Sequence, residues 1–140
     1  MLVLILVLAA AMIPAQAAPT VKAPDTPAGI ALAEFVESFN AGSETRRKWV
    51  ETRTTIAEEP RANILKMDAE LLQEYGPIAV ARIVSSSATS VVAIVRHAKS
   101  DAHGHLTVTV EPAAPHKVVD LGMRGATPEE IKGAGQQVGG

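Results

Sequence analysis

The feature that most constrains this chain is a complete helix signal at residues 26–43 (TPAGIALAEFVESFNAGS). Thr26 offers an oxygen to the first free backbone amides, and Pro27 suits the first helical position, where no amide partner is needed. Gly42 tolerates positive φ and can end the helix. Apolar residues recur at spacings of three and four and so share one face: Ala28, Leu32, Phe35, Val36 and Phe39. We expect this amphipathic helix, which holds both phenylalanines of the chain, to fill a core.

Length and composition narrow the class of protein. A chain of 140 residues predicts one domain. A formal net charge of -2 argues against a nucleic-acid partner, and an aromatic content of 3% removes the stacking platforms of single-strand binders. The chain has no cysteine, which excludes disulfides, thiolate metal sites and a cysteine nucleophile.

Residues 1–17 (MLVLILVLAAAMIPAQA) have the pattern of an export signal. The run from residue 2 to 13 is uncharged and apolar, and Ala15, Gln16 and Ala17 form a small-x-small cleavage site. A membrane-spanning helix needs about 20 apolar residues, and Pro14 cuts this run short. We expect cleavage near Ala17, a periplasmic or extracellular location, and no stable membrane span in the mature form. The alternative is a short membrane-tethering segment.

The next part of the chain predicts a tether and two more helices. Residues 18–25 carry prolines without periodicity, as in an extended tether. A second helix begins at a Ser43 cap and has Trp49 on a narrow apolar edge. Its other face carries Arg46, Arg47, Lys48 and Arg53, for which a solvated surface is favoured over an anion site. A third helix covers residues 61–75, with Asp68 either at the margin of the apolar stripe or as a buried acid.

After residue 77 the pattern alternates with period two. Strands are predicted at residues 78–84, 89–99, 105–111 and 117–124, and short loops between them make an antiparallel meander. In the last strand Val119, Leu121 and Met123 are expected to share the apolar face. Helices followed by a sheet indicate an α+β domain at residues 26–125, with the helices packed on the sheet. Residues 126–140 are rich in glycine and glutamine and predict a flexible tail.

Three local sequences together carry a resemblance to a known family. They are residues 26–43, the passage EYGPIAVARI at residues 74–83 and the passage PAAPHKVVDLGMRGATP at residues 112–128. In this order and spacing the chain resembles the small α+β domain found ahead of serine β-lactamase-like hydrolases and tail-specific peptidases in exported bacterial proteins. That domain is similar to the cone-like fold of nuclear transport factor two, ketosteroid isomerase and polyketide cyclases. The resemblance implies helices closed over a curved four-stranded sheet, with a pocket at the wide end.

The catalytic motifs of the associated hydrolases are absent from the chain. None of its lysines has a serine three residues earlier, so the amine that would activate a β-lactamase-type serine is missing. There is no Gly-x-Ser-x-Gly elbow and no His-Glu-x-x-His zinc helix. We therefore expect an accessory domain and no cofactor.

Candidate functional residues follow from the expected pocket. An isomerase or cyclase needs a group in the pocket to move a proton, and Asp68, Asp120 and Tyr75 are the candidates. For Asp120, a solvent-facing or salt-bridged carboxylate is favoured over a role in the pocket. The residues expected to line a ligand pocket are Phe35, Phe39 and Trp49.

The histidines offer a weaker site. His97, His103 and His105 lie near one end of the predicted sheet and form a candidate metal set, although histidines at turns and strand ends are common without a metal. His116 lies in the Pro-His-Lys sequence of the third resembling passage. For His116 the resemblance implies a role in a turn as readily as a role in binding. No metal is expected.

Three functions remain open. The first is an exported non-catalytic domain that binds a protein partner or a small apolar ligand. The second is an isomerase- or cyclase-type enzyme, and the third is a remnant or truncated gene that has lost its hydrolase domain. A homodimer through the open face of the sheet is compatible with each.

Overall fold

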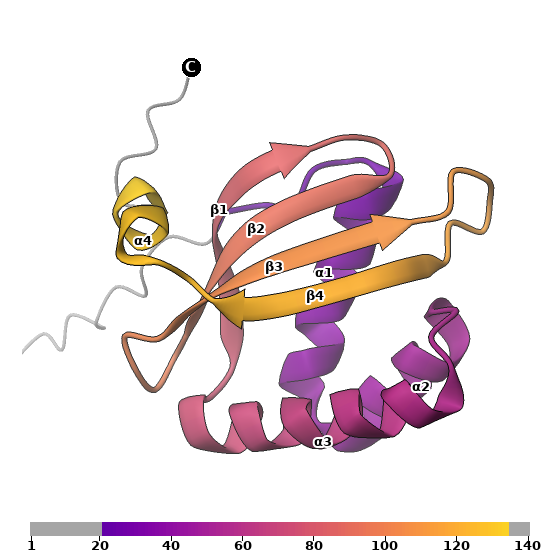
Figure 1. The fold of residues 1–140 in the computed structure, drawn as a ribbon, viewed down its shortest axis with the longest axis horizontal. Coiled ribbons are helices and arrows are strands. Elements are labelled where there is room, and N and C mark those ends of the chain that lie inside the picture. Colours follow the sequence, from indigo (N-terminus) through magenta and orange to yellow (C-terminus); the bar gives the residue numbers. More distant parts are fainter. Residues whose placement is uncertain (1–20, 135–140) are drawn as a thin grey trace, which may run out of the picture.

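The computed structural model describes residues 21–134, which fold into helices followed by an antiparallel sheet and a short last helix (Figure 1). The elements are α1 (Pro27–Ala41), α2 (Ser43–Arg53), α3 (Glu58–Tyr75), β1 (Ile78–Ser86), β2 (Ser90–His97), β3 (His103–Val110), β4 (Val118–Gly125) and α4 (Pro128–Ala134). The predicted α+β class and the four-stranded antiparallel sheet are confirmed. The predicted signal peptide, residues 18–20 of the tether and residues 135–140 lie outside the described residues.

Helix α1 begins and ends as its sequence predicts. Thr26 Oγ1 accepts a hydrogen bond from the Gly29 N–H at 3.0 Å, and Gly42 closes the helix with a φ of 103°. The predicted cap of α2 is wrong, because Ser43 is its first helical residue and Gly42 takes the cap position without a side-chain bond. The two helices are thus joined by a single glycine.

The sheet is open and has the simple order β1-β2-β3-β4. We call the face that α1 covers the inner face; Val91, Ala93 and Val95 of β2 lie on it. On this face Val91 pairs with Val108 and Ala93 with Leu106. The core that α1, α2 and the inner face share contains Leu32, Phe35, Phe39, Trp49, Val50, Ile78, Val80, Val91, Val95, Leu106, Val108, Val110 and Val118.

A register shift in β4 overturns one predicted face. Val118 pairs with Val110, but Asp120 pairs with Thr109, so Val119 is an extra residue between the two pairs. Val118 is fully buried and Val119 is 43% exposed, the reverse of the prediction. Such a bulge restarts the alternation, which is why Leu121 and Met123 still face inward as expected.

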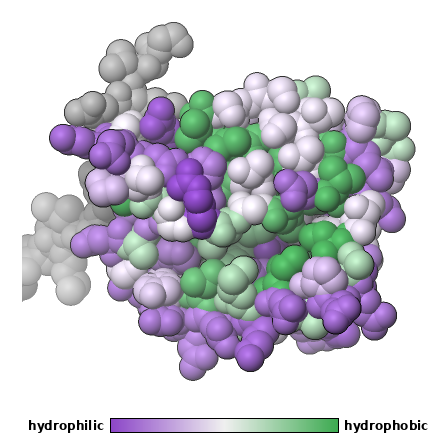
Figure 2. Space-filling view, viewed as in Figure 1, coloured by the Kyte–Doolittle hydropathy of each residue, from purple (hydrophilic) through white to green (hydrophobic). Residues whose placement is uncertain are grey.

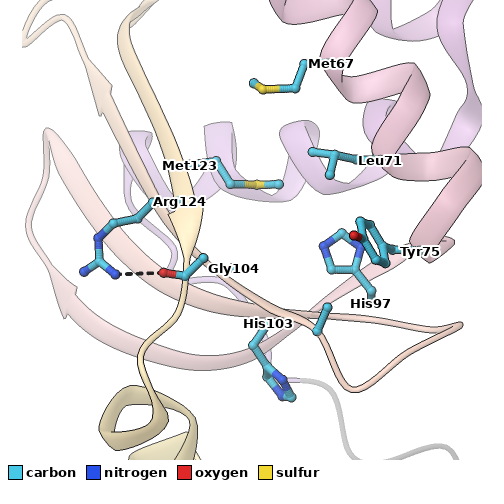
Figure 3. A pocket seen from close by; sticks show the side chains of 10 residues that line it. Met67, Leu71, Tyr75, His97, His103, Gly104, Met123 and Arg124 are labelled. Carbon is cyan, nitrogen blue, oxygen red and sulfur yellow. Dashed lines mark hydrogen bonds between the residues drawn. The ribbon is translucent and has the colours of Figure 1, made fainter.

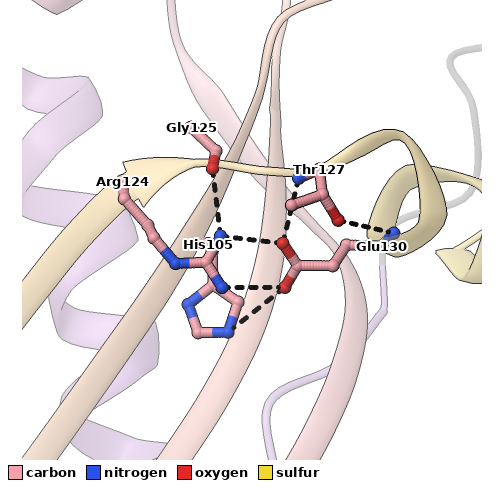
Figure 4. A network of polar contacts seen from close by, with 5 residues as sticks. All are labelled: His105, Arg124, Gly125, Thr127 and Glu130. Carbon is pink, nitrogen blue, oxygen red and sulfur yellow. Dashed lines mark hydrogen bonds and ion pairs between the residues drawn. The ribbon is translucent and has the colours of Figure 1, made fainter.

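The predicted flexible tail contains the helix α4, which lies on the outer face of the sheet against β2 (Figure 1). Thr127 and Glu130 form a capping box: the Thr127 N–H donates to Glu130 Oε1 at 2.9 Å, and the Glu130 N–H donates to Thr127 Oγ1 at 3.2 Å. Glu130 also accepts two hydrogen bonds from Arg124 and lies 3.4 Å from His105 Nε2 (Figure 4). Hydrogen bonds from Arg124 and then from the Thr127 amide lower the pKa of Glu130 to about 2. The prediction of a flexible tail is therefore wrong for residues 128–134, which form a helix with a capping box and an ion pair to Arg124.

Two polar contacts fix the start of the domain. The Val21 N–H donates to the Val80 carbonyl at 3.0 Å, so the described part of the predicted tether lies along β1. The Asn40 side chain donates to the Ile78 carbonyl at 2.9 Å and accepts from the Ile78 N–H at 2.8 Å. This pair of bonds ties the end of α1 to the beginning of the sheet. Across residues 21–134, no helix combines the length and apolar character needed to cross a bilayer.

Candidate functional site

A pocket of about 320 Å³ opens between the C-terminal half of α3 and the inner face of the sheet. Figure 2 shows apolar side chains exposed along the hollow between the sheet and α3. The residues around the pocket are Met67, Leu71, Tyr75, His97, Ala102, His103, Gly104, Met123, Arg124 and Gly125 (Figure 3). No acidic side chain is among them. The pocket therefore suits an apolar molecule.

The pocket lies along one face of α3, beside the face whose Asp68 packs against Arg46 of α2. Met67, Leu71 and Tyr75 are spaced by four residues and share the pocket face of α3. Met123, Arg124 and Gly125 line the pocket from the end of β4. On the sheet side Gly104 adds no side chain, and a Cβ there would lie 3.2 Å from Val95 Cγ2 and 3.6 Å from Met123 Cγ. The absent side chain helps to keep the inner face open.

Tyr75 and His97 supply the polar groups inside the pocket. Their ring centroids are 5.4 Å apart, at an interplanar angle of 53°, and the two rings lie side by side in Figure 3. His97 Nδ1 lies 3.5 Å from the Gly76 carbonyl oxygen. Burial lowers the pKa of His97 from its ordinary value of 6.5, the Gly76 carbonyl opposes this shift, and the charge of His103 adds to it. At neutral pH the imidazole is therefore uncharged and can accept a hydrogen bond or a proton.

The predicted metal set is not assembled. His97 lies on the inner face, in line with Val91, Ala93 and Val95. His103 and His105 pair with Arg96 and Ile94, which alternate with those residues, and so they lie on the outer face. The His103 ring lies 2.8 Å from the Asp101 carbonyl and points away from the pocket (Figure 3), and His105 contacts Glu130. In the described chain, no three His, Asp or Glu side chains are arranged to hold a metal ion. Strand alternation separates residues that are close in sequence.

Asp68 lies outside the pocket, in a buried ion pair. Arg46 Nε donates to Asp68 Oδ2 at 2.6 Å, and Arg46 Nη1 donates to Ser38 Oγ at 3.0 Å and to the Phe35 carbonyl at 3.4 Å. Burial lowers the pKa of Arg46 and raises the pKa of Asp68, while the attraction between them opposes both shifts. The prediction that Arg46 lies on a solvated face is wrong: the side chain joins α1, α2 and α3 and is 2% exposed.

The three aromatic residues expected to line a pocket surround this arginine instead. The guanidinium carbon of Arg46 lies 3.9 Å from the ring centroid of Phe35 and 5.0 Å from that of Trp49. Phe35 stacks on Phe39 at 6.3 Å and meets Trp49 edge-on at 5.9 Å. None of these rings lines the pocket next to Tyr75. The three rings are buried in the core with α1 and α2, although Phe39 and Trp49 each border another, separate cavity.

Two further candidates lie away from the pocket. Asp120 is exposed on the outer face of β4, opposite Thr109. His116 lies in the turn between β3 and β4 with a φ of 55°, and its Nδ1 is 2.9 Å from the Glu111 carbonyl. The described contacts of His116 therefore belong to the turn.

The main residues of the pocket wall were not identified from the sequence as functional. Met67, Gly104 and Met123 are absent from the candidates, and His97 was considered only as a metal ligand. A usable signal was present for α3: Met67, Leu71 and Tyr75 repeat every four residues immediately before the Gly76-Pro77 stop. Their exposure to a cavity depends on how far α3 lies from β4.

Comparison with protein-family models, curated proteins and solved structures gave no match to this chain. The assignment of a site therefore depends on the geometry of the pocket alone.

Proposed function

We propose that this chain is an exported, non-catalytic binding domain that takes a small apolar ligand in the pocket between α3 and the sheet. The observation that carries the proposal is the apolar pocket of about 320 Å³, which lies within the size range of small-molecule sites. The resemblance to cone-like accessory domains of exported hydrolases and peptidases agrees with it. The absence of hydrolase motifs in the sequence agrees with a role in binding.

The side chains around the pocket define the kind of ligand. Met67 and Met123 are flexible and polarisable, so they can adapt to an irregular apolar surface. Uncharged His97 and the Tyr75 hydroxyl provide one polar position. A mostly apolar molecule with a single hydroxyl or carbonyl group fits this arrangement.

Titration with the neutral fluorophore N-phenyl-1-naphthylamine tests the proposal. We expect saturable binding by the wild-type protein, and binding at least about tenfold weaker in Leu71→Trp, because the indole fills the pocket. Ile64→Trp is the matched control, since it lies two turns earlier on α3 and outside the pocket, and it should bind as the wild type does. No saturable binding, or equal weakening in both variants, would contradict a ligand site at this position.

A second candidate function, an isomerase- or cyclase-type enzyme, is favoured by one observation. An uncharged His97 beside Tyr75 at an apolar wall is a pair that can relay a proton. If a ketosteroid-type substrate is turned over, His97→Gln should abolish turnover while fluorophore binding remains. Asp120→Asn should leave turnover unchanged, because Asp120 is on the outer face. Failure to detect turnover with wild-type protein that binds the fluorophore favours the binding domain.

A further inference from the structure

Strand β4 forms one edge of the sheet, and part of this edge has no backbone partner in the described chain. At its beginning, Thr54 forms a parallel bridge to Val118, and the Thr55 N–H donates to the Val118 carbonyl at 2.9 Å. Farther along, the Ala126 N–H donates to the His103 carbonyl, so the even-numbered residues of this stretch turn their backbone groups toward β3. Leu121 and Met123 therefore present their N–H and C=O groups to the free edge.

The free edge of β4 opens onto the apolar hollow in front of α3. Figure 1 shows α3 on the side of β4 away from β3, and Figure 2 shows apolar atoms along the hollow between the sheet and α3. Met67 and Leu71 line the pocket from the helix, and Met123 lines it from the strand. A chain segment lying here meets backbone hydrogen-bonding groups on one side and apolar side chains on the other.

We propose that an extended peptide segment of a partner protein adds to the free edge of β4 as a fifth, antiparallel strand. Strand addition satisfies the unpaired groups of Leu121 and Met123, which repeat every two residues as a strand requires. The chain's own Thr54 and Thr55 already pair with the beginning of the same edge, through a parallel bridge. The inference rests on the proposed function in one respect, since one peptide side chain enters the same pocket.

The register predicts which side chains the partner carries. A residue directly opposite Met123 has its side chain on the inner face, and we expect it to be apolar and to enter the pocket. Asp120 and Arg124 lie on the outer face, on either side of Gly122. Asp120 is exposed and forms no ion pair with another described residue, and Arg124 is exposed although Glu130 shares its charge. A basic residue opposite Asp120 and an acidic residue opposite Arg124 complete the complementary pattern.

One feature favours a free segment over a second copy of the chain, and another favours the edge of β4 over the edge of β1. A second copy would bring its own α3 to the same edge, whereas a linear segment brings no helix. The edge of β1 accepts a bond from Val21, and two register shifts interrupt the middle of its pairing with β2, whereas the bond from Thr55 and the single shift of β4 both lie before Leu121 and Met123. Such irregularities discourage the addition of a strand.

Binding of the labelled peptide acetyl-Thr-Glu-Leu-Thr-Leu-Arg-Thr-amide, measured by fluorescence anisotropy, tests the proposal. In the proposed register the first leucine lies opposite Met123, the second opposite Leu121, and the arginine opposite Asp120. Replacing the amide N–H of the first leucine by an ester oxygen should weaken binding about two- to tenfold, because one interstrand hydrogen bond is lost. The same replacement at the central threonine is the matched control and should have no effect, since that N–H points away from β4.

A charge exchange tests the register without altering the backbone. A peptide with glutamate in place of its arginine should bind the wild-type protein about two- to fivefold more weakly than the original peptide. The variant Asp120→Lys should reverse this preference. Asp120 is exposed and outside the pocket, so the variant should bind N-phenyl-1-naphthylamine as the wild type does.

Each result decides between defined alternatives. No peptide binding, equal effects of the two esters, or a charge preference that Asp120→Lys does not reverse would overturn strand addition. Self-association that Asp120→Lys abolishes would assign the edge to a second copy and overturn a free peptide as its occupant. Fluorophore binding without peptide binding removes this inference alone. Peptide binding with the expected ester effect, but without fluorophore binding, removes the small-molecule function and leaves strand addition supported.

Discussion

Two neighbouring faces of α3 have different surroundings. On one face, Asp68 is 5% exposed and is held by Arg46 at 2.6 Å beneath the rings of α1 and α2. On the other face, Met67, Leu71 and Tyr75 line an open pocket with His97 at its wall. The first is a closed face in the core, and the second is an open face that forms a pocket wall.

The difference comes from what lies opposite each face. Helix α2 packs against α3 and supplies Arg46, so the charge of Asp68 is neutralised and water is excluded. Opposite the open face, Met123 and Gly125 of β4 line the pocket. A face of a helix thus becomes core or pocket wall according to its neighbours.

The strongest effect is expected at the closed face of α3. Asp68→Leu should lower the free energy of unfolding by about 3–5 kcal/mol, because it leaves the Arg46 guanidinium buried without a counter-charge. Denaturant unfolding followed by circular dichroism measures this loss. The double variant Arg46→Met with Asp68→Leu should recover most of the stability, since apolar groups of similar volume replace the whole pair. If the double variant is as unstable as the single one, the ion pair itself stabilises the packing of the closed face.

A pair of truncations compares core with pocket wall. Phe39→Ala should cost about 3–5 kcal/mol of unfolding free energy, because Phe39 is 2% exposed and stacks on Phe35. Met67→Ala should cost less than about 1 kcal/mol, because Met67 is 47% exposed at the pocket. Chemical denaturation of both variants under one condition provides the comparison. A small loss in Phe39→Ala together with altered fluorophore binding would place Phe39 on a pocket wall and contradict its assignment to the core.

The weakest effect is expected to be a pH dependence at the pocket, beside the open face of α3. Because the pKa of folded His97 is below its ordinary value of 6.5, the unfolded chain binds more protons between these two values. The free energy of unfolding should therefore fall as the pH drops from about 6.5 toward the lowered pKa. His97→Gln should flatten this part of the stability profile, measured by urea unfolding at a series of pH values. An unchanged profile would mean that protonation of His97 is not coupled to folding.

Much of the fold could be predicted because its signals are local. Thr26, Pro27 and Gly42 bound α1, and the stop at Gly76 ends α3, because capping and positive φ depend on a few neighbouring residues. The change from helical to alternating periodicity located all four strands. The bulge at Val119 was not predictable, because an extra residue in a strand is defined only against its partner. The α4 helix is not predicted, because glycines dominate the impression of a flexible tail, although Thr127 and Glu130 have the spacing of a capping box.

The candidate site was predicted less well, for the same physical reason. Phe35, Phe39 and Trp49 are large and apolar whether they border a cavity or fill a core, and only the closure of α1 and α2 around Arg46 decides between these outcomes. Asp68 and Asp120 are both aspartates in alternating or periodic segments, yet one is buried in an ion pair and the other is exposed.

The class of the fold, the order of its elements and the limits of α1 follow from the residues alone, as does the lack of Ser-x-x-Lys, Gly-x-Ser-x-Gly and His-Glu-x-x-His motifs. These properties depend on backbone preferences, periodicity and residue types, which are local along the chain. The burial of Arg46, the division of the three histidines between two faces, and the pocket shared by Tyr75 and His97 emerge only in the folded molecule. They depend on distances between segments far apart in sequence, and these distances are set by how whole helices and strands pack.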